Sequence, residues 1–373
     1  MLSLLAMKLI EQDKNESFNI DEPIWISPNG NLLDIEIDAK FDLQKIKNAY
    51  PNLWRYEDAI AINQQDGIVS LNEGFTPIEK IKLNGKEVYI KHEQLFSTGS
   101  YKDRGATTLI SKAKQLGVKK IVQDSSGNAG CAIAAYAAKA NIKCEIYLPE
   151  NTSNSKISQM LAYGATINKI KGDRNDTSIA AWEAAKNIYY ASHCYNPWFF
   201  EGTKTFAFEV CEQLGWKSPD SLVLPAGNGT LIIGCYIGFS QLLKAGIIHQ
   251  MPKIIAVQTE TCCPLYDAFF DTKNSDNNYS SNTIAEGIAI INAPRAEQIL
   301  NAVKETEGTF IKVNEAEIKD AWIKIAAMGN YIEPTSAATI AGLEKYIQGS
   351  LDQTIVSLFS GHGLKSKSLI EQI

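Results

Sequence analysis

The sequence has no run of about 18 apolar residues, the length that a membrane-spanning helix requires. Its first residues, MLSLLAMK, are apolar but carry no basic region, so we expect a short helix or strand there rather than a signal peptide. Positive charge is not in excess, because 36 Lys and Arg face 42 Asp and Glu, for a net charge of −6. We therefore expect a cytoplasmic protein with neither nucleic-acid nor membrane partners.

Cysteine pairs with a recognisable spacing are also lacking. The seven cysteines are an odd number without a Cys-x-x-Cys pair, and they are Cys131, Cys144, Cys194, Cys211, Cys235, Cys262 and Cys263. This pattern predicts reduced thiols, and neither a disulfide framework nor a zinc site. We expect no bound metal.

The composition is that of a globular protein, with 45% hydrophobic and 21% charged residues, and 373 residues favour about two domains. From Val88 onward, strand and helix patterns alternate, which predicts an α/β fold with a mostly parallel, covered sheet. The expected strands are 121–124, 144–149, 221–226, 253–259 and 354–359, and the expected helices are 105–116, 129–140, 231–244, 317–328 and 335–347. A helix–strand pair is expected over 154–170, and a polar loop over 271–283.

Lys102 stands in the segment STGSYKDRG (97–105), between a Gly-Ser turn and the start of a helix. A lysine that forms a Schiff base needs a fixed position and partial removal from water, which such a place can supply. A solvated lysine at a helix start would give the same pattern, so this segment alone leaves both interpretations open.

Two further segments place glycine-rich turns between a strand and a helix. These are SSGNAG (125–130) and PAGNGT (225–230). Free backbone N–H groups at a helix N-terminus attract a carboxylate or a phosphate, and glycines let the backbone approach it closely. Ordinary helix caps and tight turns remain alternatives for each segment. Two possible anion-binding turns and Lys102 in one α/β chain are not easily explained as coincidence.

Eight motifs in order resemble threonine synthase and its relatives, the fold-type II pyridoxal-phosphate (PLP) enzymes of the tryptophan synthase beta superfamily. The resemblance covers roughly residues 50–373. The motifs are SLNEGFTPI (70–78), KHEQLFSTGSYKDRG (91–105), SSGNAG (125–130), KISQMLAYGA (156–165), EGTKTFAFE (201–209), PAGNGT (225–230), EPTSAA (333–338) and SGHGLK (360–365).

The resemblance implies a role for each matching residue. Lys102 matches the catalytic lysine that forms the Schiff base with PLP, and Asn128 matches the asparagine beside the PLP ring hydroxyl. Ser360 matches the hydroxyl residue that faces the pyridine nitrogen, while Asp103, Arg104 and His362 are expected to be structural. The phosphate loop corresponds to Gly227, Asn228, Gly229 and Thr230, and the loop that receives the substrate carboxylate corresponds to Ser125, Ser126, Gly127 and Ala129.

The chain departs from the family where threonine synthases bind the phosphate of O-phosphohomoserine. In the segment SHCYNPWFFEG (192–202), His193 and Cys194 stand at two polar positions and Phe199 stands at the position of an arginine. Ala129 replaces a threonine. Because a buried phosphate without its arginine would be costly, we expect a smaller or more apolar substrate to suit Phe199, Cys194 and Ala129, unless Lys156 or another basic residue replaces the arginine.

The expected activity is PLP-dependent elimination or replacement at Cβ or Cγ of an amino acid, closest to threonine synthase, which forms threonine and phosphate. The alternatives are a serine/threonine deaminase-like enzyme, a β-replacement enzyme that makes an unusual amino acid, and a non-catalytic amino-acid-binding relative. Retention of Lys102, Asn128, Ser360 and the loop 227–230 favours an enzyme.

The resemblance also implies the architecture. We expect two three-layer α/β domains with PLP in the interdomain cleft, and a homodimer, as in many relatives. Residues 1–107 would form an N-terminal extension and the first part of the large domain, residues 108–200 the small domain, and residues 201–373 the rest of the large domain.

Overall fold

In the computed structural model, the described residues are 7–12, 16–152, 154–172, 174–272, 279–349 and 353–366. Most of the opening segment (1–6) and part of the predicted polar loop (273–278) lie outside these ranges. By its contacts, the chain divides into two compact units, Met1–Phe75 with Lys102–Thr205, and Thr76–Tyr101 with Phe206–Ile373. The predicted domain boundaries at 107/108 and 200/201 stay a prediction. Among the described residues, no helix has both the length and the apolar character to cross a membrane.

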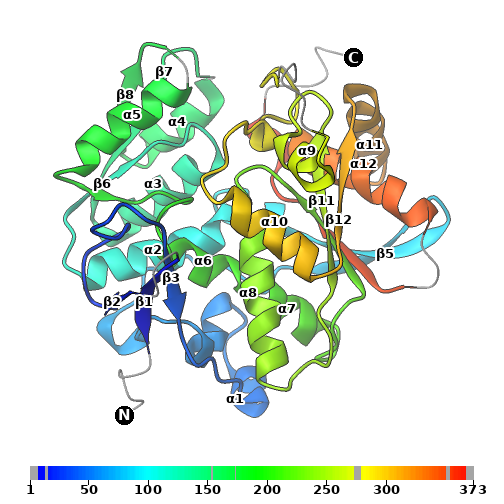
Figure 1. Cartoon of the computed structure of the whole chain (residues 1–373), viewed down its shortest axis with the longest axis horizontal. Helices are drawn as coiled ribbons and strands as arrows, with labels where there is room; N and C mark the ends of the chain where they lie inside the picture. Colours follow the sequence, from blue (N-terminus) through cyan, green and yellow to red (C-terminus); the bar gives the residue numbers. More distant parts are fainter. Residues whose placement is uncertain are drawn as a thin grey trace. The chain divides into compact units, whose positions relative to one another are not determined.

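The first unit contains a parallel sheet whose strand order is β8-β7-β6-β9. Helices α3 and α5 contact this sheet, and α4 packs beside α3 (Figure 1). The strands are β6 (Lys120–Gln123), β7 (Lys143–Pro149), β8 (Thr166–Ile170) and β9 (Tyr189–Tyr190). The helices are α2 (Lys102–Gln115), α3 (Asn128–Ala140), α4 (Asn154–Ala162), α5 (Arg174–Ala185) and α6 (Trp198–Thr203).

The N-terminal part of the first unit forms an antiparallel sheet, β2-β1-β3, and packs the ring of Trp25 against the layer that contains the parallel sheet. Trp25 makes edge-to-face contacts with Tyr190 and Trp182, with ring centroids 4.9 and 5.0 Å apart. These elements are β1 (Lys8–Glu11), β2 (Ser17–Asn19), β3 (Leu33–Glu36), α1 (Leu43–Asn48), and the 3₁₀ helices η2 (Leu53–Ala59) and η3 (Gln64–Asp66). This N-terminal part therefore supports the strand β9.

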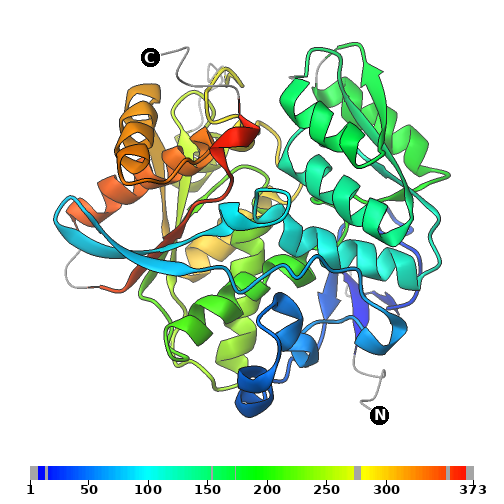
Figure 2. The same ribbon diagram turned by 180° about the vertical axis from the view of Figure 1, so that it is seen from behind.

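The second unit contains a larger sheet, and among the described residues its strand order is β12-β11-β10-β13-β5-β4. The pairs from β12 to β5 are parallel, and β4 pairs antiparallel with β5. Figure 2 shows the cyan β4–β5 hairpin beside the red strand β13. The strands are β4 (Ile78–Leu83), β5 (Lys86–Lys91), β10 (Ser221–Pro225), β11 (Lys253–Thr259), β12 (Thr309–Val313) and β13 (Ile355–Leu358).

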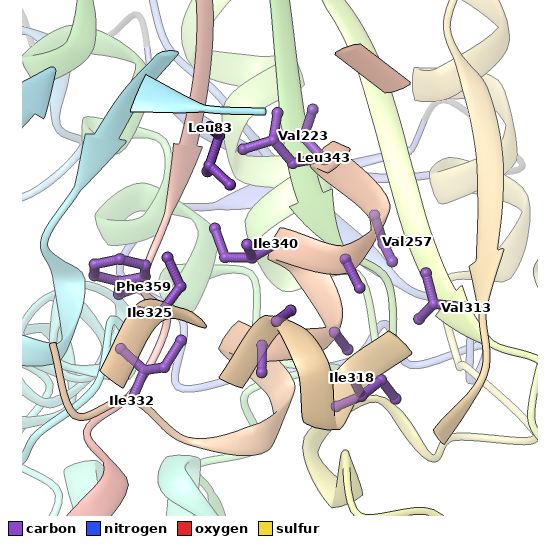
Figure 3. Packing of buried hydrophobic residues seen from close by; sticks show 14 of the residues in the cluster. Leu83, Val223, Val257, Val313, Ile318, Ile325, Ile332, Ile340, Leu343 and Phe359 are labelled. Atoms are coloured by element: carbon purple, nitrogen blue, oxygen red, sulfur yellow. The ribbon is translucent and has the colours of Figure 1, made fainter. Parts of the chain in front are cut away.

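Helices cover this sheet, and α12 lies across β10–β13. The core between α11, α12 and the sheet is mostly aliphatic, with Trp322 and Phe359 as its buried aromatic residues. Figure 3 shows Val223 and Val257 from the strands facing Ile340 and Leu343 from α12. The helices are α7 (Thr205–Gln213), α8 (Thr230–Lys244), α9 (Pro264–Phe270), α10 (Ala296–Glu305), α11 (Glu315–Ala327) and α12 (Pro334–Gln348), with the 3₁₀ helices η4 (Glu93–Leu95), η5 (Glu286–Ile288) and η6 (Gly363–Lys365).

Each predicted strand and helix is present, and the ends differ by at most three residues. The predicted helix 105–116 begins earlier, at Lys102, so that Lys102 itself is the first helical residue. The sequence interpretation missed the β4–β5 hairpin, the N-terminal sheet, α10 and β12. The predicted mostly parallel α/β fold is confirmed.

Candidate active site

The loops that follow β6 and β9 leave the same edge of the sheet in the first unit, because these two strands are parallel neighbours. The loop after β6 carries Ser125–Asn128, and the loop after β9 carries His193. Nε2 of Gln123, at the end of β6, donates to the carbonyl oxygen of Ala191, just after β9, at 2.7 Å. This hydrogen bond connects the starts of the two loops. The fold thus brings both predicted substrate loops to one edge, which is where ligands bind in open parallel sheets.

The Ser125–Gly127 loop turns tightly onto the start of α3. A Cβ on Gly130 would lie 2.0 Å from the carbonyl oxygen of Ser125, so only glycine permits this close approach. Gly127 caps the helix without a side-chain hydrogen bond to its first N–H groups, and Ala129 is buried. The N-terminus of α3 therefore presents backbone donors that suit a carboxylate.

Lys102 opens α2 and is only 7% exposed. Its Nζ lies 5.8 Å from the centroid of the Phe199 ring. Asp103 and Arg104 are fully buried in the same turn, and Arg104 Nη1 donates to Thr205 Oγ1 at 3.0 Å. These contacts fix the first turn of α2, so Lys102 has the restricted position and partial desolvation that a Schiff-base lysine requires.

Phe199 lies on α6 and is wholly buried. Its ring packs on Gly105, one turn beyond Lys102, where an added Cβ would come within 2.4 Å of the ring. Gly202 likewise lets α6 approach the backbone of Arg104. The position at which the family resemblance expects an arginine is therefore filled by a tightly packed, uncharged ring.

His193 meets Phe199 edge to face, with ring centroids 5.9 Å apart and an interplanar angle of 70°. Burial lowers the pKa of His193 well below its usual value, and the positive charges of Lys102 and Arg174 lower it further. The imidazole is consequently neutral at pH 7. The first unit therefore brings Lys102, His193 and Phe199 together, and Phe199 and the neutral His193 add no charge beside the lysine.

A network around Glu73 supports these elements and was missed from the sequence. The carboxylate accepts hydrogen bonds from Trp54 Nε1 at 2.9 Å, Tyr136 Oη at 2.7 Å, Ser70 Oγ at 3.0 Å and the Leu71 N–H at 2.7 Å. Tyr136 lies on α3, two turns after Asn128. The motif SLNEGFTPI contained Glu73, but its partners become visible only in the fold.

In the second unit, the predicted phosphate loop and Ser360 follow β10 and β13, which are parallel neighbours. Both segments therefore lie at one sheet edge. A Cβ on Gly227 would lie 2.9 Å from the carbonyl oxygen of Gly287, and Gly229 has a φ of +72° at the start of α8. Thr230 is the first helical residue. Backbone and hydroxyl donors at this helix start suit a phosphate.

Ser360 is buried and has polar neighbours that the sequence interpretation did not assign. Its Oγ lies 3.1 Å from Glu333 Oε1 and 3.0 Å from Ser336 Oγ. Gly361 leaves room for the Glu333 carboxylate, because an added Cβ would lie 2.3 Å from its Cδ. The motif EPTSAA named Glu333 and Ser336 without a role. Both belong to the immediate surroundings of Ser360.

Tyr101 is another residue that the sequence interpretation missed. Its N–H donates to the carbonyl oxygen of Ser360 at 3.1 Å, and its hydroxyl lies 3.0 Å from Thr230 Oγ1. Tyr101 therefore contacts both Ser360 and the loop that ends at Thr230. His362 serves the same segment structurally, because its N–H donates to the carbonyl oxygen of Gly99 at 2.9 Å.

These residues fit the requirements of PLP. Lys102 is held in place and partly desolvated, the N-terminus of α8 suits the cofactor phosphate, and the N-terminus of α3 suits a substrate carboxylate. The sequence model of the family described as "Pyridoxal-phosphate dependent enzyme" matches residues 69–361, which is more than half of the chain. The chain therefore belongs to this family, and it is a PLP-dependent enzyme of fold type II.

Relatives narrow the class further. The chain is 35% identical to the threonine synthase of Methanocaldococcus jannaschii over 94% of this chain and 91% of that protein. It is 34% identical to the threonine synthase of Methanosarcina acetivorans over 95% and 91%. The structure of serine racemase from Dictyostelium discoideum is similar, with a TM-score of 0.65, 26% identity, and coverage of 77% of this chain and 92% of that one. The chain is thus a PLP-dependent lyase or synthase close to threonine synthase.

Proposed function

We propose that this enzyme catalyses elimination or replacement at Cβ or Cγ of a small amino acid whose side chain carries no phosphate. The observation that carries this proposal is Phe199, buried on Gly105 with its ring 5.8 Å from Lys102 Nζ. A phosphate dianion beside a buried aromatic ring would lose its hydration without gaining a charge-assisted hydrogen bond. An uncharged substituent meets no such penalty.

Separate groups of residues would hold the cofactor and bind the substrate. PLP, when bound, supplies the electron sink that stabilises negative charge at the substrate's reacting carbon. Lys102 would hold PLP covalently and, once released, move substrate protons through its Nζ. Asn128, Ser360 and the loop Gly227–Thr230, including Asn228, would orient the ring and phosphate. The N-terminus of α3, with Ser125, Ser126, Gly127 and Ala129, would bind the substrate carboxylate.

His193 and Phe199 would select the substrate's side chain. A neutral imidazole can donate or accept one hydrogen bond to a hydroxyl or ester group, but it offers no net charge to a phosphate. The aromatic ring of Phe199 adds apolar contact beside it. This pair therefore favours substrates such as serine, threonine or an O-acylated hydroxy amino acid.

Threonine formation from O-phosphohomoserine is the second candidate. It is favoured by the identity with two proteins named threonine synthase over more than 90% of their lengths. This alternative needs a cation in place of the one that position 199 lacks, and Arg174, whose charge helps to lower the pKa of His193, is the candidate to test. Under this alternative, Arg174→Gln would abolish turnover of O-phosphohomoserine. Under the first proposal, the same substitution would leave turnover of uncharged substrates within about twofold.

The test is to supply the PLP-loaded enzyme with serine, threonine, O-acetylserine and O-phosphohomoserine separately. Amino acid products, keto acid, ammonia and phosphate are then measured, with Lys102→Ala as the inactive control. Higher kcat/KM for an uncharged substrate supports the proposal. Stoichiometric threonine and phosphate from O-phosphohomoserine, at the highest kcat/KM of the four, would refute it. Keto acid with ammonia identifies elimination, whereas a new amino acid that needs an added nucleophile identifies replacement.

We further propose a cytoplasmic homodimer. The family resemblance supports the dimer, and the net charge of −6 without a signal-like segment at residues 1–8 supports a cytoplasmic protein. Sedimentation velocity of the PLP-loaded enzyme would give twice the 41.1 kDa chain mass if the dimer is correct.

A further inference from the structure

The hydroxyl of Tyr101 lies 3.0 Å from the hydroxyl oxygen of Thr230. Tyr101 immediately precedes Lys102, and Thr230 is the first residue of α8, at the end of the loop assigned to the phosphate. The two residues are 129 positions apart in the chain. This contact thus connects the lysine-bearing segment with the phosphate loop.

The chemistry of the two hydroxyl groups gives the contact a direction. A threonine hydroxyl has one proton and two lone pairs, whereas a phosphate dianion only accepts hydrogen bonds. If Thr230 gives its proton to the phosphate, it must accept from Tyr101. Hydrogen bonds arranged in such a chain polarise one another and strengthen the last one.

The backbone of this segment is held independently of the Tyr101 hydroxyl. The Tyr101 N–H donates to Ser360, Ser100 forms a bridge with Gly361, and Lys365 Nζ donates to the carbonyl oxygen of Thr98 at 2.6 Å. A phenylalanine at position 101 would therefore keep the ring and the backbone contacts and remove only the hydroxyl.

We propose that Tyr101 is a positioning residue for the cofactor phosphate. Its hydroxyl donates to Thr230 and thereby turns the Thr230 proton toward the phosphate. The inference rests on the proposed role of Gly227–Thr230 and extends it to a residue outside that loop. It also gives Tyr101 a role distinct from that of Lys102, since Tyr101 acts on the phosphate end of the cofactor rather than on its aldehyde.

The test compares PLP with pyridoxal, which has the same ring and aldehyde but no phosphate. Dissociation constants of both are measured for the wild type and Tyr101→Phe, by the absorbance of the lysine-bound cofactor after reconstitution. We expect Tyr101→Phe to weaken PLP binding about 3- to 10-fold, the range for the loss of one hydrogen bond between neutral groups, and to leave pyridoxal binding unchanged. Equal weakening of both, or no weakening of either, would overturn the inference.

A matched control is Tyr346→Phe, which removes a Tyr–Ser hydroxyl bond of 2.7 Å to Ser221 at the first residue of β10, away from the phosphate loop. Tyr346→Phe should change neither the dissociation constant of PLP nor that of pyridoxal. Thr230→Val should weaken PLP binding, and adding Tyr101→Phe to it should weaken binding no further. An additive double variant would overturn only the role of Tyr101. Unchanged PLP binding in Thr230→Val would refute the phosphate-loop assignment, and the inference with it.

Discussion

The ring of Phe199 occupies the space that a side chain at Gly105 would need. A Cβ on Gly105 would lie 2.4 Å from Cδ1 and Cε1 of the ring. Gly105 is three residues beyond Lys102, on the same face of α2. The packing of α6 against α2 therefore decides what surrounds the lysine.

Gly105→Ala should destabilise the protein. Overpacking of this kind lowers the free energy of unfolding by about 1–3 kcal/mol, whereas the higher helix propensity of alanine raises it by about 1 kcal/mol. We therefore expect a net decrease in the free energy of unfolding. The free energy of unfolding is measured by urea denaturation of the PLP-loaded enzyme. Gly349→Ala is the control, because nothing lies within 4 Å of its added Cβ. In a Phe199→Ala background, Gly105→Ala should no longer destabilise; a persistent loss there would contradict the explanation.

Stability should fall on acidification partly because of His193. Its folded-state pKa is well below the usual 6.5, so the unfolded chain takes up a proton at a pH where the folded chain does not. The contribution of His193 to the free energy of unfolding is fully present above about pH 6.5. It is lost as the pH falls below that value, by at most about 1.4 kcal/mol per pH unit. Urea denaturation between pH 5 and 8 measures this. His193→Asn should flatten the curve, and the exposed His249→Asn should not. Identical slopes in all three proteins would contradict the prediction.

Trp25 should stabilise the strand that leads to His193. Trp25→Ala removes edge-to-face contacts with Tyr190 and Trp182 and should cost about 2–4 kcal/mol in unfolding free energy. We also expect a higher KM for the amino acid with a smaller change in kcat, because the loop after β9 loses support. Trp25→Phe should restore most of the free energy of unfolding and most of the wild-type KM. Tyr50→Ala, which truncates a ring that is 66% exposed, is the control. A Trp25→Ala enzyme as stable as the control would refute this role.

The seven cysteines should be unreactive in the native enzyme. All seven are buried thiols, and burial raises the pKa of Cys144 to about 12 and that of Cys263 to about 11. Since the thiolate is the reacting form, a disulfide reagent at pH 8 should modify them slowly. After denaturation it should titrate seven thiols per chain. Fewer than seven in the denatured protein, without added reductant, would indicate a disulfide.

Much of the fold was predictable because its signals are local. The helices α3 and α8 begin after glycine-rich turns, and the buried strands β10 and β11 are short apolar runs. The hairpin strand β4 exposes about half of its residues, so it gave no comparable apolar run. The N-terminal sheet was missed because its strands have only three or four residues, and β1 pairs with the distant strand β3.

Some properties of the candidate site were also predictable from local sequence, and others were not. The sequence by itself determined the family and the cofactor, and it predicted the roles of Lys102, Asn128 and Ser360, because cofactor chemistry demands particular residue types in ordered motifs. It also predicted that Phe199 stands at the position of the family's arginine. These properties depend on residue identity and short spacing, which the chain carries without folding.

Only the tertiary structure decided which residues surround these groups. Tyr101 meets Thr230 across 129 positions, and Glu333 reaches Ser360 because β13 and α12 bring their ends together. Phe199 fills the space beside Lys102 since Gly105 and Gly202 let two helices approach. A hydrogen bond or a close packing contact depends on distance in space, and residues far apart in sequence acquire that distance only when the chain folds.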